Sequence, residues 1–426
     1  MFRAPRRLLI ALVALLVAVP AGATNGYFFH GYGTKYKALA GAGTALYLGP
    51  MAIANNPATL AFGNPGYDAT VSLFSPSRSY TVTGDPSGAP STLGLAPGEY
   101  ESNSDVSFIP SIAATRYLNE DETVMIGIAG FGNGQMNTDY PLATFDPGAS
   151  FPDTNPTGMD LTQMFLAPAI AFSLGERHAF GLSPILAYQR FDAKGLAPFG
   201  AMGSSSNIDK LSNNDYASSF GYGTRVGYLG ELLDFFSVGF SYQTKIAMGE
   251  FDEYSGLFAE AGDFDIPANW TAGVMMGFYG MGIAFDVQHI AYSDVASIGN
   301  PLLPNLNNAQ LGDAAGAGLG WEDMTIFKGG AWYMTNAGNM FRLGYSHGNQ
   351  PVPESEVLLG ILAPGVVEKH LTFGVSKVLD SGREFSFSLM RGLWGSVSGP
   401  NPLEAPGQQT IELSMDQWEF GFGVTF

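Results

Sequence analysis

Hydrophobic and polar residues alternate along much of this chain, which is the pattern of β-strands. The last segment shows it clearly, because Trp418, Phe420, Phe422, Val424 and Phe426 fall on even positions while polar or small residues fall on odd ones. Successive side chains of a strand point to opposite faces, so one face here is aromatic. An aqueous β-sandwich would also alternate, but a lipid-facing barrel needs an apolar outer face and a polar lumen. The pattern therefore indicates a bacterial outer-membrane barrel.

Fourteen such segments follow one another over residues 66–426. Short turns rich in Asn, Asp and Gly alternate with much longer loops, as in barrels with short periplasmic turns and long extracellular loops. An even strand number returns both ends of the barrel to the periplasmic side. We predict an all-β fold, a 14-stranded antiparallel transmembrane β-barrel. The predicted strands are 66–80, 107–117, 123–136, 162–174, 179–192, 216–231, 235–249, 268–278, 281–292, 323–335, 340–348, 368–379, 384–395 and 412–426.

The alternation also assigns the faces of individual strands. Ile283 and Phe285 alternate with Ala284 and Asp286 in the ninth predicted strand. A charge at the bilayer midplane would be costly. We therefore expect Asp286 to face the lumen.

The first 23 residues resemble a secretory signal peptide. Arg3, Arg6 and Arg7 precede an uninterrupted apolar run of about 12 residues, and small residues at 21–23 fit a cleavage site. Such a run is too short for a helix that spans a bilayer. We expect residues 1–23 to be removed.

Residues 24–65 break the strand pattern. They are rich in Ala and Gly and also contain apolar residues such as Tyr27, Phe28 and Ile53. A solvated tail would be less apolar. We expect short helices and turns that form a plug, or hatch, inside the lumen; a disordered periplasmic tail is the alternative.

Composition restricts the function further. The chain has no cysteine, so disulfides, thiolate catalysis and Cys–metal sites are absent. Its formal charge of −19 makes nucleic acid a poor partner. Many carboxylates lie in predicted loops, where they favour solubility or bridge to lipopolysaccharide through divalent cations. We expect outer-membrane lipid and lipopolysaccharide as partners.

No catalytic or metal-binding pattern is present. The histidines show no metal-type spacing and no nearby Ser/Asp arrangement of a hydrolase; they stand at positions 30, 178, 289, 347 and 370. We predict no catalytic residues, no metal site and no cofactor.

Several short motifs resemble the FadL/TodX-type transporters, which carry long-chain fatty acids or hydrocarbons across the outer membrane. The likeness runs over the whole mature chain, and the Asn-Pro-Ala motif with the Pro-Val-Pro loop is its most specific part. The motifs are 25–28 (Asn-Gly-Tyr-Phe), 31–33 (Gly-Tyr-Gly), 40–43 (Ala-Gly-Ala-Gly), Asn56, Pro57 and Ala58, 292–294 (Tyr-Ser-Asp), 341–344 (Phe-Arg-Leu-Gly) and 351–353 (Pro-Val-Pro).

The resemblance implies a monomeric barrel whose hatch carries the Asn-Pro-Ala motif. In the family, apolar cargo meets a groove among the outer loops and then a pocket near the start of the hatch. By carry-over, Phe28 and Phe29 would lie near that pocket. Cargo then leaves sideways through an opening at a kink in the third strand.

We place this kink at Gly132, Asn133 and Gly134, because glycine in a strand often marks a bulge. The alternative is simple glycine packing on the lumen side.

One departure from the family concerns the cargo. Family fatty-acid transporters have a lysine shortly before the tenth strand that helps to hold the carboxylate, but Glu322 and Asp323 occupy that region here. Lys328 and Arg342 remain candidate cations.

A passive channel for hydrophobic molecules explains both the plug and the apolar stretch 357–362 in a surface loop. A general aqueous porin, or a barrel enzyme or adhesin, are the alternatives. We also expect the barrel assembly machinery to recognise the C-terminal Phe426.

Overall fold

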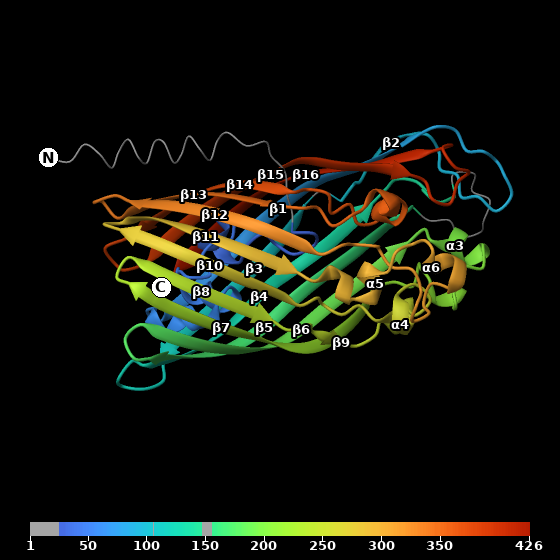
Figure 1. Cartoon of the computed structure of the whole chain (residues 1–426). Coiled ribbons are helices and arrows are strands. Elements are labelled where there is room, and N and C mark those ends of the chain that lie inside the picture. The colour runs from blue at the N-terminus through green and yellow to red at the C-terminus, as the bar shows by residue number, and fades with distance from the viewer. Residues whose placement is uncertain (1–24, 105, 147–155) are drawn as a thin grey trace.

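The computed structural model is a closed antiparallel β-barrel of fourteen strands (Figure 1). The structure describes residues 25–104, 106–146 and 156–426, so the predicted signal peptide lies outside the described residues. Pairing of the first and last strands from Asp68–Thr425 to Thr83–Thr410 closes the ring. The predicted fold class is confirmed.

Each ring strand pairs with its sequence neighbour. Two short strands lie outside the ring: β2 (Gly98–Glu101) pairs with β1 and β9 (Ala247–Met248) with β7. The ring strands are β1 (Gly66–Thr83), β3 (Ser107–Tyr117), β4 (Val124–Asp139), β5 (Gly158–Leu174), β6 (His178–Lys194), β7 (Ala217–Leu233), β8 (Phe236–Gln243), β10 (Asn269–Phe278), β11 (Met281–Ile290), β12 (Met324–Met334), β13 (Asn339–Gly348), β14 (Lys369–Val378), β15 (Glu384–Pro400) and β16 (Thr410–Thr425).

All fourteen predicted strands are present, and three of them have an end that differs from the prediction by four residues or more. β5 begins at Gly158 rather than 162, and β15 continues to Pro400 rather than 395. Both extensions pair with neighbouring strands beyond the part of the barrel that faces lipid. There, lipid no longer requires apolar and polar residues to alternate. The predicted strand 235–249 is divided, because the chain leaves the ring after Gln243 and Ile246 pairs with Ile266 instead.

The strand faces agree with the predicted alternation. In β16, Trp418, Phe420 and Phe422 are exposed on the outer surface, while Gln417 and Glu419 are buried inside. In β11, Phe285 is exposed and Asp286 is fully buried. The outer surface is thus apolar, as a lipid-facing wall requires.

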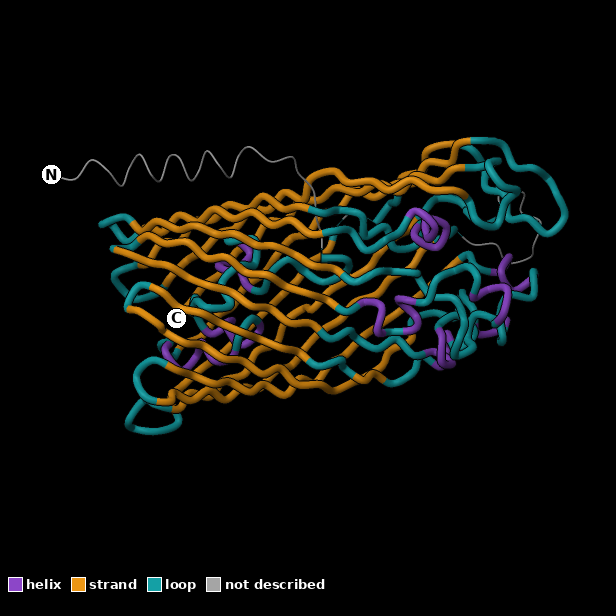
Figure 2. The backbone as a smooth tube through the Cα atoms, in the orientation of Figure 1, coloured by secondary structure: helices purple, strands orange, loops and turns teal. Residues whose placement is uncertain are grey.

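The two ends of the barrel differ. Short connections and the C-terminus lie at one end, while the long loops and their helices lie at the other (Figures 1 and 2). These loops carry α3 (Ala197–Ala201), η3 (Ile208–Lys210), η4 (Asp252–Tyr254), α4 (Ala259–Gly262), η5 (Tyr292–Asp294), α5 (Ala296–Gly299), α6 (Asn305–Asn308), η6 (Glu354–Glu356) and α7 (Val357–Gly360).

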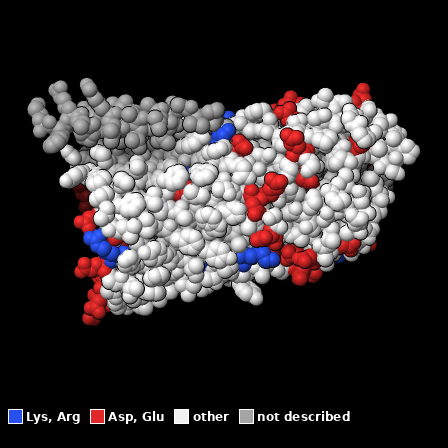
Figure 3. All heavy atoms as spheres, viewed as in Figure 1, with Lys and Arg blue, Asp and Glu red and all other residues white. Residues whose placement is uncertain are grey.

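Charged side chains are scarce over the strands on the face seen in Figure 3 and gather toward the two ends. This distribution leaves an apolar band between them, as expected of a barrel that lipid surrounds. Among the described residues, no helix is long and apolar enough to cross a membrane.

Three short helices precede the barrel in residues 25–65. They are α2 (Gly33–Lys37), η1 (Pro50–Ala54) and η2 (Pro57–Phe62). The strands surround them at the short-turn end (Figure 2).

Candidate functional site

Residues 25–65, here called the N-terminal segment, are hydrogen-bonded to strands around the ring. Lys35 is paired with Glu384 of β15 at 2.9 Å, and Ala40 N donates to Thr372 Oγ1 of β14 at 3.0 Å. On other sides, β4, β7, β11 and β12 contribute further hydrogen bonds. The lumen therefore contains a folded segment rather than an open channel.

Glycines on the lumen side of the strands leave room for this segment. A Cβ at Gly239 would lie 2.3 Å from the Thr44 carbonyl oxygen, and one at Gly227 would lie 2.0 Å from the Asn56 side chain. A Cβ at Gly374 would similarly lie 2.3 Å from the Ala38 Cβ. These strand positions require glycine because the segment packs directly against the barrel backbone.

Asn56 connects the segment to itself and to the wall. Its fully buried side chain donates to the carbonyl oxygens of Thr44 at 2.7 Å and Tyr228 at 3.0 Å, and accepts from Ala58 N at 3.0 Å. Pro57 occupies the first turn of η2, where a missing N–H costs nothing. The Asn-Pro-Ala motif thus begins η2, and its anchoring role stays a prediction.

Asp286 provides a second attachment. Its Oδ2 accepts from Gly43 N, Thr44 N and Thr44 Oγ1 at 2.9, 2.9 and 2.8 Å. A buried carboxylate needs such donors in place of water. The lumen-facing charge predicted from the alternation therefore binds the backbone of the N-terminal segment.

An aromatic cluster surrounds the start of the segment. The Tyr27 ring lies 5.1 Å from the Phe28 ring and 5.4 Å from the Tyr292 ring, and Tyr292 lies 5.2 Å from Trp321. All four side chains are buried. The cluster is an apolar surface inside the barrel that includes Phe28, and the role of Phe28 at a ligand pocket stays a prediction.

A cavity of about 20 Å³ lies beside this cluster. Its lining includes Gly26, Arg78, Trp321 and Met415. This volume suits one water-sized group rather than a hydrocarbon chain. Cargo would reach the cluster only after side chains or loops move.

Two donors in the cavity lining stand out. Trp321 Nε1 is buried without a hydrogen-bond partner. Arg78 is 5% exposed and donates to the Ser104 carbonyl oxygen at 3.1 Å, but forms no ion pair with a described residue. A guanidinium has five N–H donors, so Arg78 can bind an acceptor in addition to the Ser104 carbonyl oxygen.

Phe29 points away from the aromatic cluster. Its ring lies 6.2 Å from Phe74 and 5.2 Å from the Lys37 ammonium, and it approaches Gly132 of β4. The structure therefore separates the two predicted pocket residues: Phe28 belongs to the cluster, whereas Phe29 lies against the wall.

The wall is irregular at this point. The β4–β5 register shifts between Gly132 and Gly134, so Asn133 is an extra residue in β4. Inward positions of β4 are odd as far as Phe131 and even from Gly134 onward. Moreover, β3 pairs with β4 only from Ser111–Phe131 to Tyr117–Met125.

The N-terminal segment forms hydrogen bonds with the part of the β4 edge that does not pair with β3. Phe29 N donates to the Asn133 carbonyl oxygen at 3.1 Å, and Gln135 N donates to the Tyr27 carbonyl oxygen at 3.0 Å. Phe28 and Gly134 thus form an antiparallel bridge. The predicted kink residues are located at a bulge, and whether they form an exit stays a prediction.

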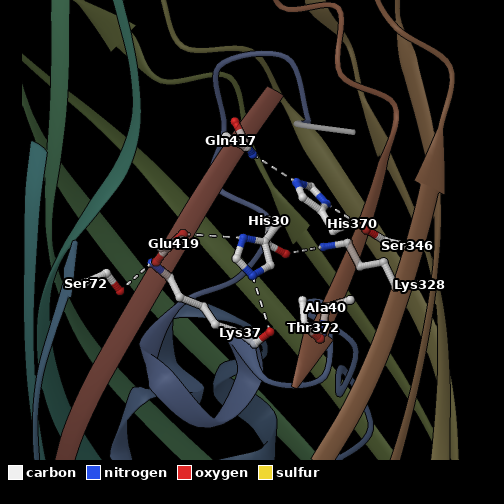
Figure 4. Close-up of polar contacts among 10 residues, drawn as sticks. All are labelled: His30, Lys37, Ala40, Ser72, Lys328, Ser346, His370, Thr372, Gln417 and Glu419. Atoms are coloured by element: carbon white, nitrogen blue, oxygen red, sulfur yellow. Dashed lines mark hydrogen bonds and ion pairs between the residues drawn. The ribbon is translucent and has the colours of Figure 1, made fainter. Parts of the chain in front are cut away.

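A buried polar network, which we call the histidine network, lies between the segment and the strands (Figure 4). The segment contributes His30 and Lys37; β12, β14 and β16 contribute Lys328, His370 and Glu419. Lys37 is paired with Glu419, and Lys328 donates to the His30 carbonyl oxygen at 3.1 Å.

The two candidate cations do not line the cavity beside the aromatic cluster. Lys328 belongs to the histidine network, and Arg342 lies 3.6 Å from Glu384 at the short-turn end. Sequence reasoning missed Arg78. Its only signal was a basic residue at an inward position of the first strand.

The apolar stretch 357–362 lies in the long loop between β13 and β14, as predicted, but its side chains are buried. The Tyr140 hydroxyl donates to the Ile361 carbonyl oxygen at 3.1 Å, and Thr138 Oγ1 donates to the Leu362 carbonyl oxygen at 2.8 Å. Inward apolar residues of the outer strand ends, including Ile411 and Leu413, supply a dry surface. Exposing the stretch to water would forfeit that burial.

Among the described residues, no group of three or more His, Asp or Glu side chains is arranged to hold a metal ion.

Comparison with known proteins gives one family match. The family model described as "Outer membrane protein transport protein (OMPP1/FadL/TodX)" matches residues 23–361. An uncharacterized protein in the phosphoenolpyruvate carboxykinase gene 5' region of Chlorobium limicola is 49% identical over 57 residues, or 13% of this chain. The match spans 28% of that relative's length.

Solved structures share the fold. The Pseudomonas putida toluene transporter TodX has a TM-score of 0.68 at 18% identity and covers 93% of this chain and 99% of its own. A Pseudomonas aeruginosa FadL homologue has a TM-score of 0.67 at 15% identity, with coverage of 94% and 99%. The Ralstonia pickettii toluene transporter TbuX has a TM-score of 0.57 at 18% identity, with coverage of 92% and 98%.

We predict that Asn56→Ala loosens the N-terminal segment without unfolding the barrel. The change removes the amide donor to two buried carbonyl oxygens, a loss of about 2 kcal/mol. Limited proteolysis near the N-terminus should then become about thirtyfold faster. Asn55→Ala is the matched control, because Asn55 Nδ2 has no partner. Equal cleavage of both variants would contradict the anchoring role.

Proposed function

Because the chain belongs to the FadL/TodX family of outer-membrane transport proteins, as its motifs predicted, we propose that it is a passive channel for hydrophobic molecules. Outer loops capture the cargo, which passes the N-terminal segment and leaves sideways through the barrel wall. The segment acts as the hatch that closes this path.

One observation supports the lateral exit most strongly. The backbone of the outer part of β4 pairs with β5 but not with β3. Tyr27 and Phe29 fill part of the space with two backbone hydrogen bonds, and Ser107 and Gln135 exchange side-chain hydrogen bonds across it. The gap between β3 and β4 is therefore closed by these few hydrogen bonds instead of a continuous backbone ladder, which supports an opening here.

The direction of transport follows from burial of apolar surface. An apolar molecule gains about 0.8 kcal/mol for each CH₂ that leaves water. The aromatic cluster offers it such an environment inside the barrel, and the lipid beside β3 and β4 offers another. An aqueous path to the periplasm would forfeit this gain, so a side exit suits hydrophobic cargo.

A general aqueous porin is less well supported. The segment and the buried stretch 357–362 fill the lumen, and the cavity beside the aromatic cluster measures about 20 Å³. A porin needs a continuous watery passage. No specific feature favours an enzyme or an adhesin.

The cavity lining suggests that the cargo carries a polar head. Arg78 and Trp321 present N–H groups beside the apolar cluster, and Arg78 has no ion pair with a described residue. A carboxylate could accept from both while its chain packs on the aromatic rings. We therefore favour a long-chain fatty acid over a plain hydrocarbon.

The surroundings of the barrel fit the same role. The closed ring leaves no free edge for pairing between copies, which supports a monomer. Its apolar outer surface supports placement in the outer membrane beside lipid and lipopolysaccharide. The exposed aromatic ring of Phe426 is available to the barrel assembly machinery.

Deleting residues 26–60 should raise single-channel conductance in planar bilayers. The deletion removes the segment that fills a lumen otherwise wide enough for water. Heat-modifiable migration in electrophoresis would verify that the barrel is folded. Unchanged conductance of a folded deletion variant would refute the hatch role.

Gly132→Val should slow the lateral exit. The new side chain would point at Ile109 and Phe29, because a Cβ at this position would lie 3.0 and 3.1 Å from their side-chain atoms. An added barrier of about 1–3 kcal/mol corresponds to a rate lower by a factor of about five or more. Cellular uptake of a labelled fatty acid measures this effect.

Gly130→Val is the control for this variant, because its Cβ would meet only Ile112 at 3.7 Å. Gly134 is unsuitable, since a Cβ there would lie 2.3 Å from the Tyr27 carbonyl oxygen and displace the segment. Full uptake by folded Gly132→Val protein would reject this exit.

Arg78→Met should weaken fatty-acid binding about ten- to hundredfold, because a hydrogen bond to a charged group contributes about 1.5–3 kcal/mol. Binding of an alkane of equal length should change little. Arg190→Met, at a half-exposed arginine paired with Asp160, serves as the control. Titration of purified protein with both ligands measures the difference, and an equal loss for both would contradict the carboxylate site.

A further inference from the structure

Two histidines meet inside the barrel, one from each of its two parts. The centre of the His30 ring, in the N-terminal segment, lies 4.8 Å from that of His370 in β14. Both side chains are buried, at 2% and 0% exposure. Figure 4 shows them at the centre of the histidine network. A change of charge on either ring would therefore act directly on the contact between segment and wall.

Burial, together with the Lys37 and Lys328 ammonium groups, favours a neutral His30 ring. Its Nε2 lies 3.3 Å from the Lys37 carbonyl oxygen, which can only accept, so Nε2 carries the proton. Nδ1 then presents a lone pair to Glu419 Oε2 at 3.7 Å. This carboxylate oxygen has no hydrogen-bond donor.

The hydrogen bonds of His370 fit a neutral ring. Gln417 Nε2 lies 3.3 Å from His370 Nε2, and an amide nitrogen only donates, so this ring nitrogen accepts. Nδ1 therefore carries the proton and donates to Ser346 Oγ at 2.8 Å. Each ring thus has one bonded N–H and one nitrogen able to take a further proton.

The charges around the rings are balanced while both histidines are neutral. Lys37 of the segment and Lys328 of β12 are the cations; Glu419 of β16 and Asp286 of β11 are the anions. Glu419 is already paired with Lys37, and Asp286 Oδ2 is occupied by Gly43 and Thr44. Two additional protons would place four positive charges against two negative ones without water.

The cations near the His30 ring change its pKa. Burial, together with the nearby Lys37 and Lys328, holds the pKa of His30 well below its ordinary value. Release of the segment would return the ring to water and to a pKa of about 6.5. Protons therefore bind more readily to the released segment than to the docked one.

We propose that His30 and His370 form a proton-sensitive latch, which holds residues 27–41 docked at neutral pH and releases them in acid. The proposal rests on the hatch role of the segment and adds its regulation. The same residues close the gap between β3 and β4, because Tyr27 and Phe29 are bonded to β4. Acid would thus open both the lumen and the wall.

The sign and size of the effect follow from proton linkage. Above a pH of about 6.5 both histidines are neutral whether the segment is docked or released, so pH has little effect. Below it, release takes up protons, and the released fraction rises about tenfold per pH unit for each histidine that stays neutral when docked. Two histidines give up to about a hundredfold per unit.

The test compares planar-bilayer conductance at about pH 7.5 and about pH 5. The variants are His30→Gln, His370→Gln and the double variant; glutamine retains an amide N–H but takes up no proton in this range. His347→Gln is the matched control, because His347 is exposed on β13. The protein lacking residues 26–60 reports how the empty barrel itself responds to pH.

Wild type and His347→Gln should gain conductance at the lower pH relative to the empty barrel. The double variant should gain none, and each single variant should show a shallower pH dependence. A flat wild-type response, or an undiminished rise in the folded double variant, would overturn the latch. If the empty barrel conducts no more than wild type at about pH 7.5, the hatch role itself fails, and the latch with it.

Discussion

The rest of this structure depends on how a fourteen-stranded ring fills its lumen. A ring of this size is too wide for side chains alone to fill. The N-terminal segment fills it with backbone, and each buried N–H and C=O of that backbone needs a partner. Inward residues such as Asp286 and Thr372 provide these partners, and lumen glycines such as Gly239 leave the space.

This requirement divides the lumen into two kinds of surface. Around the middle of the segment, the wall is polar because Lys37, Lys328 and the backbone near Ala40 need charges and acceptors. At its start, near Tyr27, the wall is aromatic and nearly dry. The start of the segment thus packs in an apolar environment, while charges and hydrogen bonds hold its middle part in place.

Much of the fold could be predicted from the sequence, because lipid imposes alternation on each strand separately. Phe422 outside and Asp286 inside follow from local pattern alone. Contacts between side chains within the lumen could not be predicted. His30 and His370, for example, are 340 positions apart in the sequence and come together only in the closed barrel. Arg78 was missed because its position beside Trp321 follows only from the closed ring and the long loops. The loop position of the stretch 357–362 could be predicted, but its burial could not, because apolar residues in a loop do not show what they pack against.

The bulge at Asn133 joins these parts. One inserted residue separates β4 from β3 while the pairing with β5 continues, so the gap opens on one side only. The backbone groups of β4 that β3 leaves cannot be satisfied by lipid. Tyr27 and Phe29 satisfy two of them, at Asn133 and Gln135. The segment thus does more than block a hole: it replaces a missing strand partner. Without the segment, the Asn133 carbonyl oxygen and the Gln135 N–H would face lipid unpaired, so the gap that the bulge leaves in the wall depends on the segment for its backbone partners.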